Sequence, residues 1–174
     1  LKTEKEAVEA LVKAIPAVVK ADSEAAIKAA WEANKAYVEN NGEYVTPIYN
    51  EAALDAAVTA LHNLNIAALN KEIAKLPAAS AVKLTDKAAV MAAYDKAVSL
   101  NDATEEVDGM FEGETRFTMT TINGLYDAVR TLDKNAAIAK VNAIPVEVKL
   151  ADKATIEAAR AACDEFIKEY TDYD

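Results

Sequence analysis

Three stretches of this chain share one pattern: IPAVVKADS at residues 15–23, LPAASAVKLTD at residues 76–86 and IPVEVKLAD at residues 144–152. Each begins with an aliphatic residue and a proline, passes through a Val-Lys pair and ends on Asp or Ser. An Ala-rich segment with helical periodicity follows each stretch. The prolines Pro16, Pro77 and Pro145 are separated by 61 and then by 68 residues. Recurrence at such a period is the signature of a repeat protein, so we expect this stretch to set the architecture.

The similarity between the copies continues upstream of the proline. Four apolar positions recur at an offset of 68 residues: Leu54, Leu61, Leu64 and Ile73 correspond to Ile122, Val129, Leu132 and Val141. One repeat therefore predicts a helix, a short second helix, a proline-containing link and a third helix. We expect a partial copy with two helices at residues 1–41, and complete copies at residues 42–112 and 113–174.

The middle copy predicts two helices before its proline. The first is expected over about residues 50–63, with Asn50 as its N-cap, and the second over about residues 66–75, capped by Asn65. The second helix should end before the proline, because a residue that precedes proline is disfavoured in the α region. The apolar positions of both helices fall on one stripe: Leu54, Ala57, Val58 and Leu61 in the first, and Ile66, Leu69, Ile73 and Leu76 in the second.

The link and the helix after it complete the copy. The link is predicted to alternate, with Val82 and Leu84 inward and Lys83 outward. Ser23, Asp86 and Asp152 occupy the position of an N-cap for the helices that follow. The buried sides of these helices are predicted to comprise Ile27, Ala30, Trp31 and Tyr37, then Val90, Tyr94, Ala97 and Val98, then Ile156, Ala159, Cys163 and Phe166.

None of these helices can bury its stripe alone, and short connections make neighbours antiparallel. We therefore expect an all-α fold of tandem antiparallel three-helix-bundle repeats in an extended array, with helix in more than roughly 65% of residues, against about a third in an average globular protein. The joints at residues 38–49 and 99–120 should be the least helical parts. Each contains a Gly-Glu pair followed by β-formers, at 42–46 and 113–118, which predicts short extended segments.

Composition and charge exclude several classes of function. Hydrophobic residues make up 52% of the chain but aromatic residues only 6%, and Ala, the best helix former, supplies much of the difference. The formal net charge of −10 argues against nucleic acid, whose phosphates attract Lys and Arg, and against an anionic membrane surface. No apolar run approaches the ~20 residues of a membrane span, so we expect no membrane insertion.

The joint Asn101–Glu114 contains six carboxylates within fourteen residues. Ca²⁺ prefers such clustered oxygens, so a weak Ca²⁺ site is one interpretation. The EF-hand spacing is not met, because Thr104 and Thr115 would take the first and last ligand positions around Gly109. A solvated acidic loop is the simpler interpretation, and we predict no defined metal site.

The residues predict no catalysis. The single Cys163 and the single His62 cannot form an internal disulfide or a zinc site. His62 is expected near the end of a helix, where its cationic form would be favourable, and Cys163 should be a small core residue. Trp31, Tyr37, Tyr94 and Phe166 favour core packing over a carbohydrate platform. Exposed contacts are better expected from Tyr44, Tyr49, Tyr170 and Tyr173. We therefore predict no catalytic residues, no cofactor and no enzyme.

The copies at Leu76–Leu100 and Ile144–Phe166 resemble the helical repeats of large Gram-positive cell-surface and S-layer-type proteins. The shared pattern is Ile/Leu-Pro, a Val-Lys-Leu link, Asp-Lys-Ala, and then Ile/Val with Ala-Ala and an aromatic residue. The resemblance implies a secreted, modular protein at the cell wall or cell surface. It implies no catalytic residues, and this chain lacks an S-layer-homology anchoring motif.

Two functions remain open on this basis. The first is a structural spacer or assembly module of an extracellular bacterial surface protein, whose partners are copies of itself or neighbouring surface-protein domains. The second is an adhesin-like binding module that recognises a protein or a glycan through the joints between copies. Evenly charged faces would favour the first, and a concave patch with exposed tyrosines would favour the second.

Overall fold

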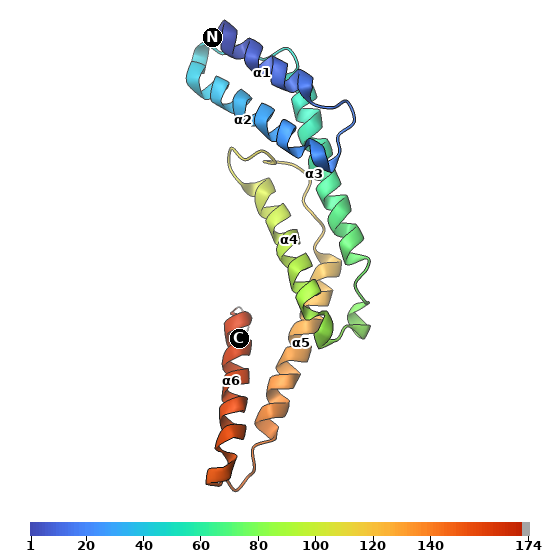
Figure 1. The fold of residues 1–174 in the computed structure, drawn as a ribbon, viewed down its shortest axis with the longest axis vertical. Coiled ribbons are helices and arrows are strands. Elements are labelled where there is room, and N and C mark those ends of the chain that lie inside the picture. Colours follow the sequence, from blue (N-terminus) through green and yellow to red (C-terminus); the bar gives the residue numbers. More distant parts are fainter. Residues whose placement is uncertain (172–174) are drawn as a thin grey trace. The chain divides into compact units, whose positions relative to one another are not determined.

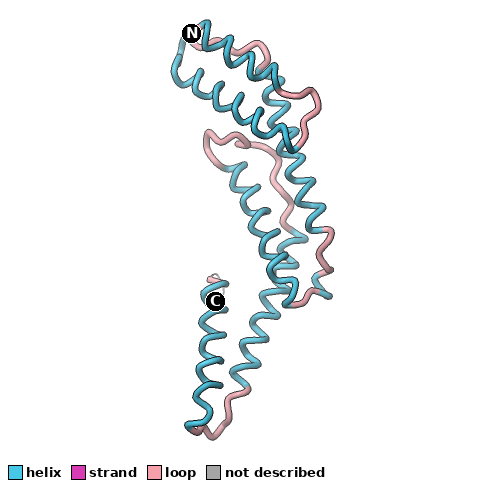
Figure 2. The backbone as a smooth tube through the Cα atoms, viewed as in Figure 1, coloured by secondary structure: helices cyan, strands magenta, loops and turns pink. Residues whose placement is uncertain are grey.

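The computed structural model describes residues 1–171, apart from the side chain of Glu43. The described residues form six α-helices joined by loops and short 3₁₀ turns (Figure 1): α1 (Lys2–Ala14), α2 (Glu24–Asn41), α3 (Glu51–Ile73), α4 (Lys87–Glu105), α5 (Thr120–Asn142) and α6 (Lys153–Glu169). Helix, with the short 3₁₀ turns included, accounts for 75% of the structure, and no described residue lies in a strand (Figure 2). The prediction of an all-α chain with more than roughly 65% helix is confirmed.

The predicted division of the long helix at residues 63–66 is wrong. α3 runs without interruption from Glu51 to Ile73, so Asn65 is an interior residue and not a cap. α5 is equally continuous at the equivalent residues. Asn is a weak helix former but does not interrupt the backbone hydrogen bonds as proline does, and apolar residues continue on both sides of it. The second and third copies therefore each have two helices, one long and one after the link, where three were predicted. The partial first copy has two helices, α1 and α2, as predicted.

The described chain divides into two compact units. Unit 1 comprises Leu1–Glu72 and Lys96–Phe117, and unit 2 comprises Ile73–Asp95 and Thr118–Asp174. Both α3 and α4 pass from one unit into the other. These two units are defined by which residues pack together. The copies at 1–41, 42–112 and 113–174 are defined by the recurring sequence pattern, and their boundaries stay a prediction.

The core of unit 1 draws on three helices. α1 packs on α2 (Figure 1), and residues from the first half of α3 complete the same cluster. Small and branched side chains dominate this core, which lets the helices approach closely. Its buried members are Val8, Val12, Ile27, Ala30, Tyr37, Ile48, Leu54, Ala57, Val58 and Leu61.

The core of unit 2 is built around α5. α5 packs on α6, and the link that precedes α4 lies against α5. The predicted stripe positions Val90 and Ala97 are buried, and Ala159 is buried at the repeat position of Ala30 and Ala93. The predicted buried sides of the helices that follow the links are thus correct at these positions.

The three links share one local structure. Pro16, Pro77 and Pro145 each follow the end of a helix, as predicted. A lysine with extended backbone comes next, and a 3₁₀ turn of three residues leads into the following helix. The backbone N–H of this lysine donates to the side chain three residues on: Lys20 to Ser23 at 3.1 Å, Lys83 to Asp86 at 2.9 Å and Lys149 to Asp152 at 2.7 Å. We call this arrangement the link lock.

The link lock corrects two details of the sequence analysis. Ser23, Asp86 and Asp152 stand directly before their helices, as predicted for caps, but their side chains accept from the upstream lysine amide. Ser23 and Asp152 form no side-chain cap bond to the helix that follows. Val82 is buried as predicted, whereas Leu84 is exposed. Leu84 begins the 3₁₀ turn, and this tighter backbone ends the alternation on which the prediction rested.

The two joints contain no strands among their described residues. The first opens with a 3₁₀ turn at Gly42–Tyr44, and residues 114–119 of the second have no regular structure. Both joints do share a glycine with positive φ, 49° at Gly42 and 75° at Gly113. This conformation is readily open only to glycine, which accounts for the matching Gly-Glu pairs.

One helix of the described chain, α3, is long and apolar enough by length and composition to cross a membrane. The sequence predicts no such helix, because it predicts a division of this segment at residues 63–66. A core helix of a folded domain passes the same criterion, and α3 contributes Leu54 and Leu61 to the core of unit 1.

The link lock generates a stability prediction. Replacing Asp152→Ala removes the acceptor for the Lys149 amide and should lower the free energy of unfolding by about 1 kcal/mol, measured by urea unfolding. Glu147→Ala, which removes an exposed carboxylate from the same link, is the matched control and should change stability by less than about 0.5 kcal/mol. Equal effects of the two substitutions would contradict a specific role for the lock.

Candidate functional site

His62 is fully buried in the middle of α3. The predicted position near a helix end is wrong because α3 continues to Ile73. Nε2 lies 2.7 Å from the carbonyl oxygen of Thr115, and since a carbonyl can only accept, Nε2 carries a proton and donates. The ring also contacts Phe111, with 5.1 Å between the ring centroids. His62 therefore fastens the second joint to α3.

The other ring nitrogen of His62, Nδ1, is buried and has no hydrogen-bond partner among the described residues. A general base must reach the proton that it removes. Nδ1 faces the protein interior, and Nε2 is already bonded to the joint. The geometry of the only histidine thus matches a structural tether.

Asn101 fixes the end of the same joint. Its Oδ1 accepts from the backbone N–H of Phe117 at 2.7 Å, and its Nδ2 donates to the Phe117 carbonyl at 3.2 Å. Both residues are buried. These two hydrogen bonds satisfy the buried backbone N–H and carbonyl of Phe117, which lies in an irregular segment, much as a neighbouring strand would. Sequence reasoning missed it, because Asn101 was counted only as the start of an acidic loop.

The acidic stretch 101–114 is only partly a loop, because its first five residues complete α4. Its carboxylates serve different partners. Glu105 pairs with Arg116, Glu112 accepts from the Asp108 amide at 2.8 Å, and Glu114 accepts from the Thr59 hydroxyl at 2.5 Å. Among the described residues, no group of three His, Cys, Asp or Glu side chains is placed to hold a metal ion. The weak Ca²⁺ site therefore lacks a preformed ligand set in this part of the chain.

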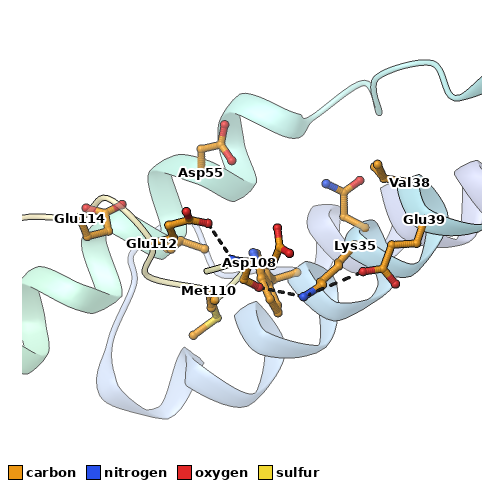
Figure 3. A pocket seen from close by; sticks show the side chains of 12 residues that line it. Lys35, Val38, Glu39, Asp55, Asp108, Met110, Glu112 and Glu114 are labelled. Atoms are coloured by element: carbon orange, nitrogen blue, oxygen red, sulfur yellow. Dashed lines mark hydrogen bonds and ion pairs between the residues drawn. The ribbon is translucent and has the colours of Figure 1, made fainter. Parts of the chain in front are cut away.

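A hollow of about 510 Å³ lies in unit 1 between α2, α3 and the second joint (Figure 3). Trp31 and Val58 are among its apolar lining. Its lining carboxylates are Glu39, Asp55, Asp108, Glu112 and Glu114. A surface with this balance of groups suits a cationic or amphipathic group better than an anion.

Lys35 is the basic residue in the lining of this hollow. Its Nζ donates to the Asp108 carbonyl at 2.8 Å, pairs with Glu39 at 4.0 Å and lies 5.3 Å from the centre of the Trp31 ring (Figure 3). The lysine thus draws α2 and the joint together across one side of the hollow.

A second polar cluster lies in unit 2, where α4, α5 and α6 meet. Lys87 at the start of α4 pairs with Asp133 of α5 at 2.6 Å and also with Glu169 of α6. Tyr170 is 1% exposed, and its hydroxyl donates to Asp133 at 2.6 Å. The four side chains form a brace between three helices, which we call the Lys87 brace.

The Lys87 brace raises the pKa of two of its groups, the Tyr170 hydroxyl and the Lys87 ammonium group. Burial, followed by the hydrogen bond to Asp133, raises the pKa of the Tyr170 hydroxyl well above its ordinary value. Burial opposes the charge on Lys87, but its hydrogen bonds to Asp133 and Glu169 outweigh this and raise the pKa of the ammonium group. Both shifts keep the protons on Lys87 and Tyr170, so the brace is built to hold protons and not to release them.

Aromatic packing continues from the brace. The Tyr126 ring stacks on Tyr94 with centroids 4.2 Å apart, and Tyr170 meets Tyr126 edge-on at 5.8 Å. The prediction that Tyr170 is exposed is therefore wrong. No sequence signal predicts the brace, because Lys87, Asp133 and Glu169 are far apart in the chain. The repeat positions of Asp133 and Glu169 hold other residues, and Lys153, the repeat equivalent of Lys87, pairs instead with Glu157 of its own helix.

The remaining candidate residues are placed as follows. Tyr44 and Tyr49 are exposed, as predicted, and Tyr173 lies outside the described residues. Tyr37 is buried, and Trp31, Tyr94 and Phe166 are half-buried, which agrees with packing over an exposed platform. Cys163 is also half-buried on α6, where a fully buried position was predicted.

Comparisons with known proteins find no matching protein-family model, no matching curated protein and no matching solved structure.

The hydrogen bond from His62 to the Thr115 carbonyl predicts that substituting His62 will loosen the second joint. His62→Ala leaves a cavity in the core and frees the Thr115 carbonyl, so the free energy of unfolding should fall by about 2 to 4 kcal/mol. Residues 106–119 should also become the first site of limited proteolysis. His62→Gln keeps a donor and should retain more protection of the joint than His62→Ala. Equal cleavage rates in the two variants would contradict the tether.

The Lys87 brace predicts a pH dependence. Tyr170→Phe removes a buried hydroxyl that donates to a carboxylate, so stability at pH 7 should fall by about 1.5 to 3 kcal/mol. Because the folded state raises the pKa of Tyr170, this contribution is present below about pH 10, the ordinary tyrosine value, and is lost as the pH rises further.

Urea unfolding between pH 8 and 11 measures this effect. The stability of the unmodified chain should fall more steeply above pH 10 than that of Tyr170→Phe. Tyr44→Phe is the matched control at an exposed tyrosine, and it should keep the steep fall. Parallel curves for the unmodified chain and Tyr170→Phe would exclude Tyr170 as the source.

Proposed function

We propose that this chain is a structural spacer or assembly module of an extracellular bacterial surface protein and carries out no catalysis. The observation that supports the proposal best is the link lock, which recurs at Lys20, Lys83 and Lys149 with the same backbone turn and the same bond to the following side chain. A repeated hairpin of this kind supplies a mechanical unit that can be added many times.

The polar groups of the described chain favour a structural role. Catalysis requires reactive groups that converge on a site open to substrate. His62 donates to a backbone carbonyl, and the polar groups of the Lys87 brace are paired with one another between three helices. The location at a bacterial surface rests on the resemblance of the link and its following helix to repeats of such proteins.

The full architecture we propose is a tandem series of antiparallel three-helix bundles in an extended array. Each hairpin would be completed by the first half of the next long helix, as α3 completes the core of α1 and α2. Partners of such a module would be neighbouring domains of the same surface protein or further copies of it.

An adhesin-like binding module is the second candidate, and the hollow in unit 1 favours it. Five carboxylates line the hollow, and Tyr44 and Tyr49 are exposed in the same unit. A basic segment of a partner protein is the ligand that this charge would attract. Trp31 is the single tryptophan of the chain and lines the hollow, so its fluorescence reports occupancy directly. Saturable quenching by a lysine-rich peptide, lost in Glu112→Gln, would favour binding over the spacer function.

The spacer proposal predicts the dimensions of the particle in solution. A compact globule of this length has a radius of gyration near ~16 Å, and an extended array must exceed it. Small-angle X-ray scattering at low protein concentration, with the mass checked from the forward scattering, measures the value for the monomer. A monomer at about 16 Å would contradict the array.

A further inference from the structure

Two apolar positions of the repeat are covered in the first two copies and open in the third. The residue four before the proline is 4% exposed at Val12 and 7% at Ile73, but 43% at Val141. The valine of the Val-Lys pair packs on the core at Val19 and is 8% exposed at Val82, but it is 57% exposed at Val148. The same local structure therefore presents an apolar face that only the third copy leaves uncovered.

The first copy identifies what covers this face. Val12 belongs to one buried cluster with Ala57 and Leu61 of α3, and Ile15 and Val19 pack against this cluster. Beside it, a hollow of about 350 Å³ lies between the link and the first half of α3. The facing side of α3 consists of small residues at helical spacing: Ala53, Ala56, Ala57 and Ala60. In the second copy, the turns on both sides of Val82 lie against α5, the next long helix of the chain.

The third copy keeps the hairpin of α5 and α6 and the link lock at Lys149. Val146 and Leu150 of this link are also strongly exposed. Its apolar face is therefore formed as in the other copies.

We propose that Val141, Ile144 and Val148 form a docking surface for the first half of another repeat's long helix, one that carries small residues at the spacing of Ala53, Ala56, Ala57 and Ala60. This inference rests on the assembly function proposed above, and it specifies the surface through which one repeat would contact the next. Short side chains are specified because they line the facing side of α3 in the first copy, where they leave room for the link.

A folded second copy of the chain does not offer this helix. The small-residue side of its α3 already faces its own first link, and releasing it would expose the core residues Leu54 and Leu61. The occupant is therefore a repeat helix whose small-residue side is free.

A peptide of residues 49–64, labelled with a fluorophore, provides this helix as a probe. Anisotropy titration with the full chain should give saturable binding. Val148→Asp in the chain should weaken binding at least tenfold, and Ala56→Glu with Ala57→Glu in the peptide should do the same. Val148 is exposed, so its substitution should leave the far-UV circular dichroism unchanged. Val107→Asp, at another exposed valine, should leave the affinity unchanged.

A short peptide is only partly helical in water, so a second measurement uses a tethered helix. Residues 45–64 are appended after Asp174 through a flexible linker, which raises the effective concentration to the millimolar range. Hydrogen exchange at residues 141–150 should slow several-fold relative to a fusion that carries the two glutamate substitutions. Equal exchange in the two fusions would overturn the proposal.

The outcomes separate this inference from the proposed function. Equal exchange in the fusions, together with a radius of gyration above that of a globule, would overturn the docking surface and leave the spacer function standing. A compact, globular monomer would contradict the array itself. Concentration-dependent dimerisation that Val148→Asp abolishes, without any effect of the appended helix, would assign the face to a second copy and overturn the occupant proposed here.

Discussion

A hairpin of two Ala-rich helices cannot bury all of its apolar surface, and a third helix must cover what remains. In unit 1 the first half of α3 provides this cover, so α3 contributes residues such as Leu54 and Leu61 to the core of α1 and α2. Small side chains make the contact close, and dispersion between many methyl groups replaces the large aromatic residues of other cores. The first half of α3 packs in the core of unit 1. The same helix then continues to Ile73 without a break.

The links make the same hairpin possible three times. A proline ends the first helix, an extended lysine redirects the backbone, and a 3₁₀ turn starts the second helix. The Ser or Asp side chain closes the turn by accepting the lysine amide, which would otherwise lack a partner at the bend. Side chains that differ in charge perform the same task, so the bond and not the residue identity is what the three copies share.

The apolar periodicity predicted much of the fold. The stripes at Leu54, Val58 and Leu61, the three links and the equivalence of the prolines follow from spacing alone. The predicted division at residues 63–66 was wrong because it treated Asn65 as an N-cap. The packing of the apolar stripe around Asn65 overrides the weak helix propensity of asparagine. The His62 tether and the Lys87 brace join residues distant in sequence, and their partners occur at non-repeated positions, so no period indicates them.

The copies agree in their apolar positions and in the link lock, but they differ in the polar residues of their long helices, such as His62 and Arg130. His62 holds the second joint through Thr115, while its repeat equivalent Arg130 pairs with Asp127 and lies over the Tyr126 ring. Each polar residue serves the contacts of its own copy. A reaction centre would instead require several polar groups to be directed at one external ligand. The recurring feature is the apolar face beside each link, which is the part of the repeat that a neighbouring helix can use. The assembly through that face that we propose would account for the apolar positions that the three copies retain.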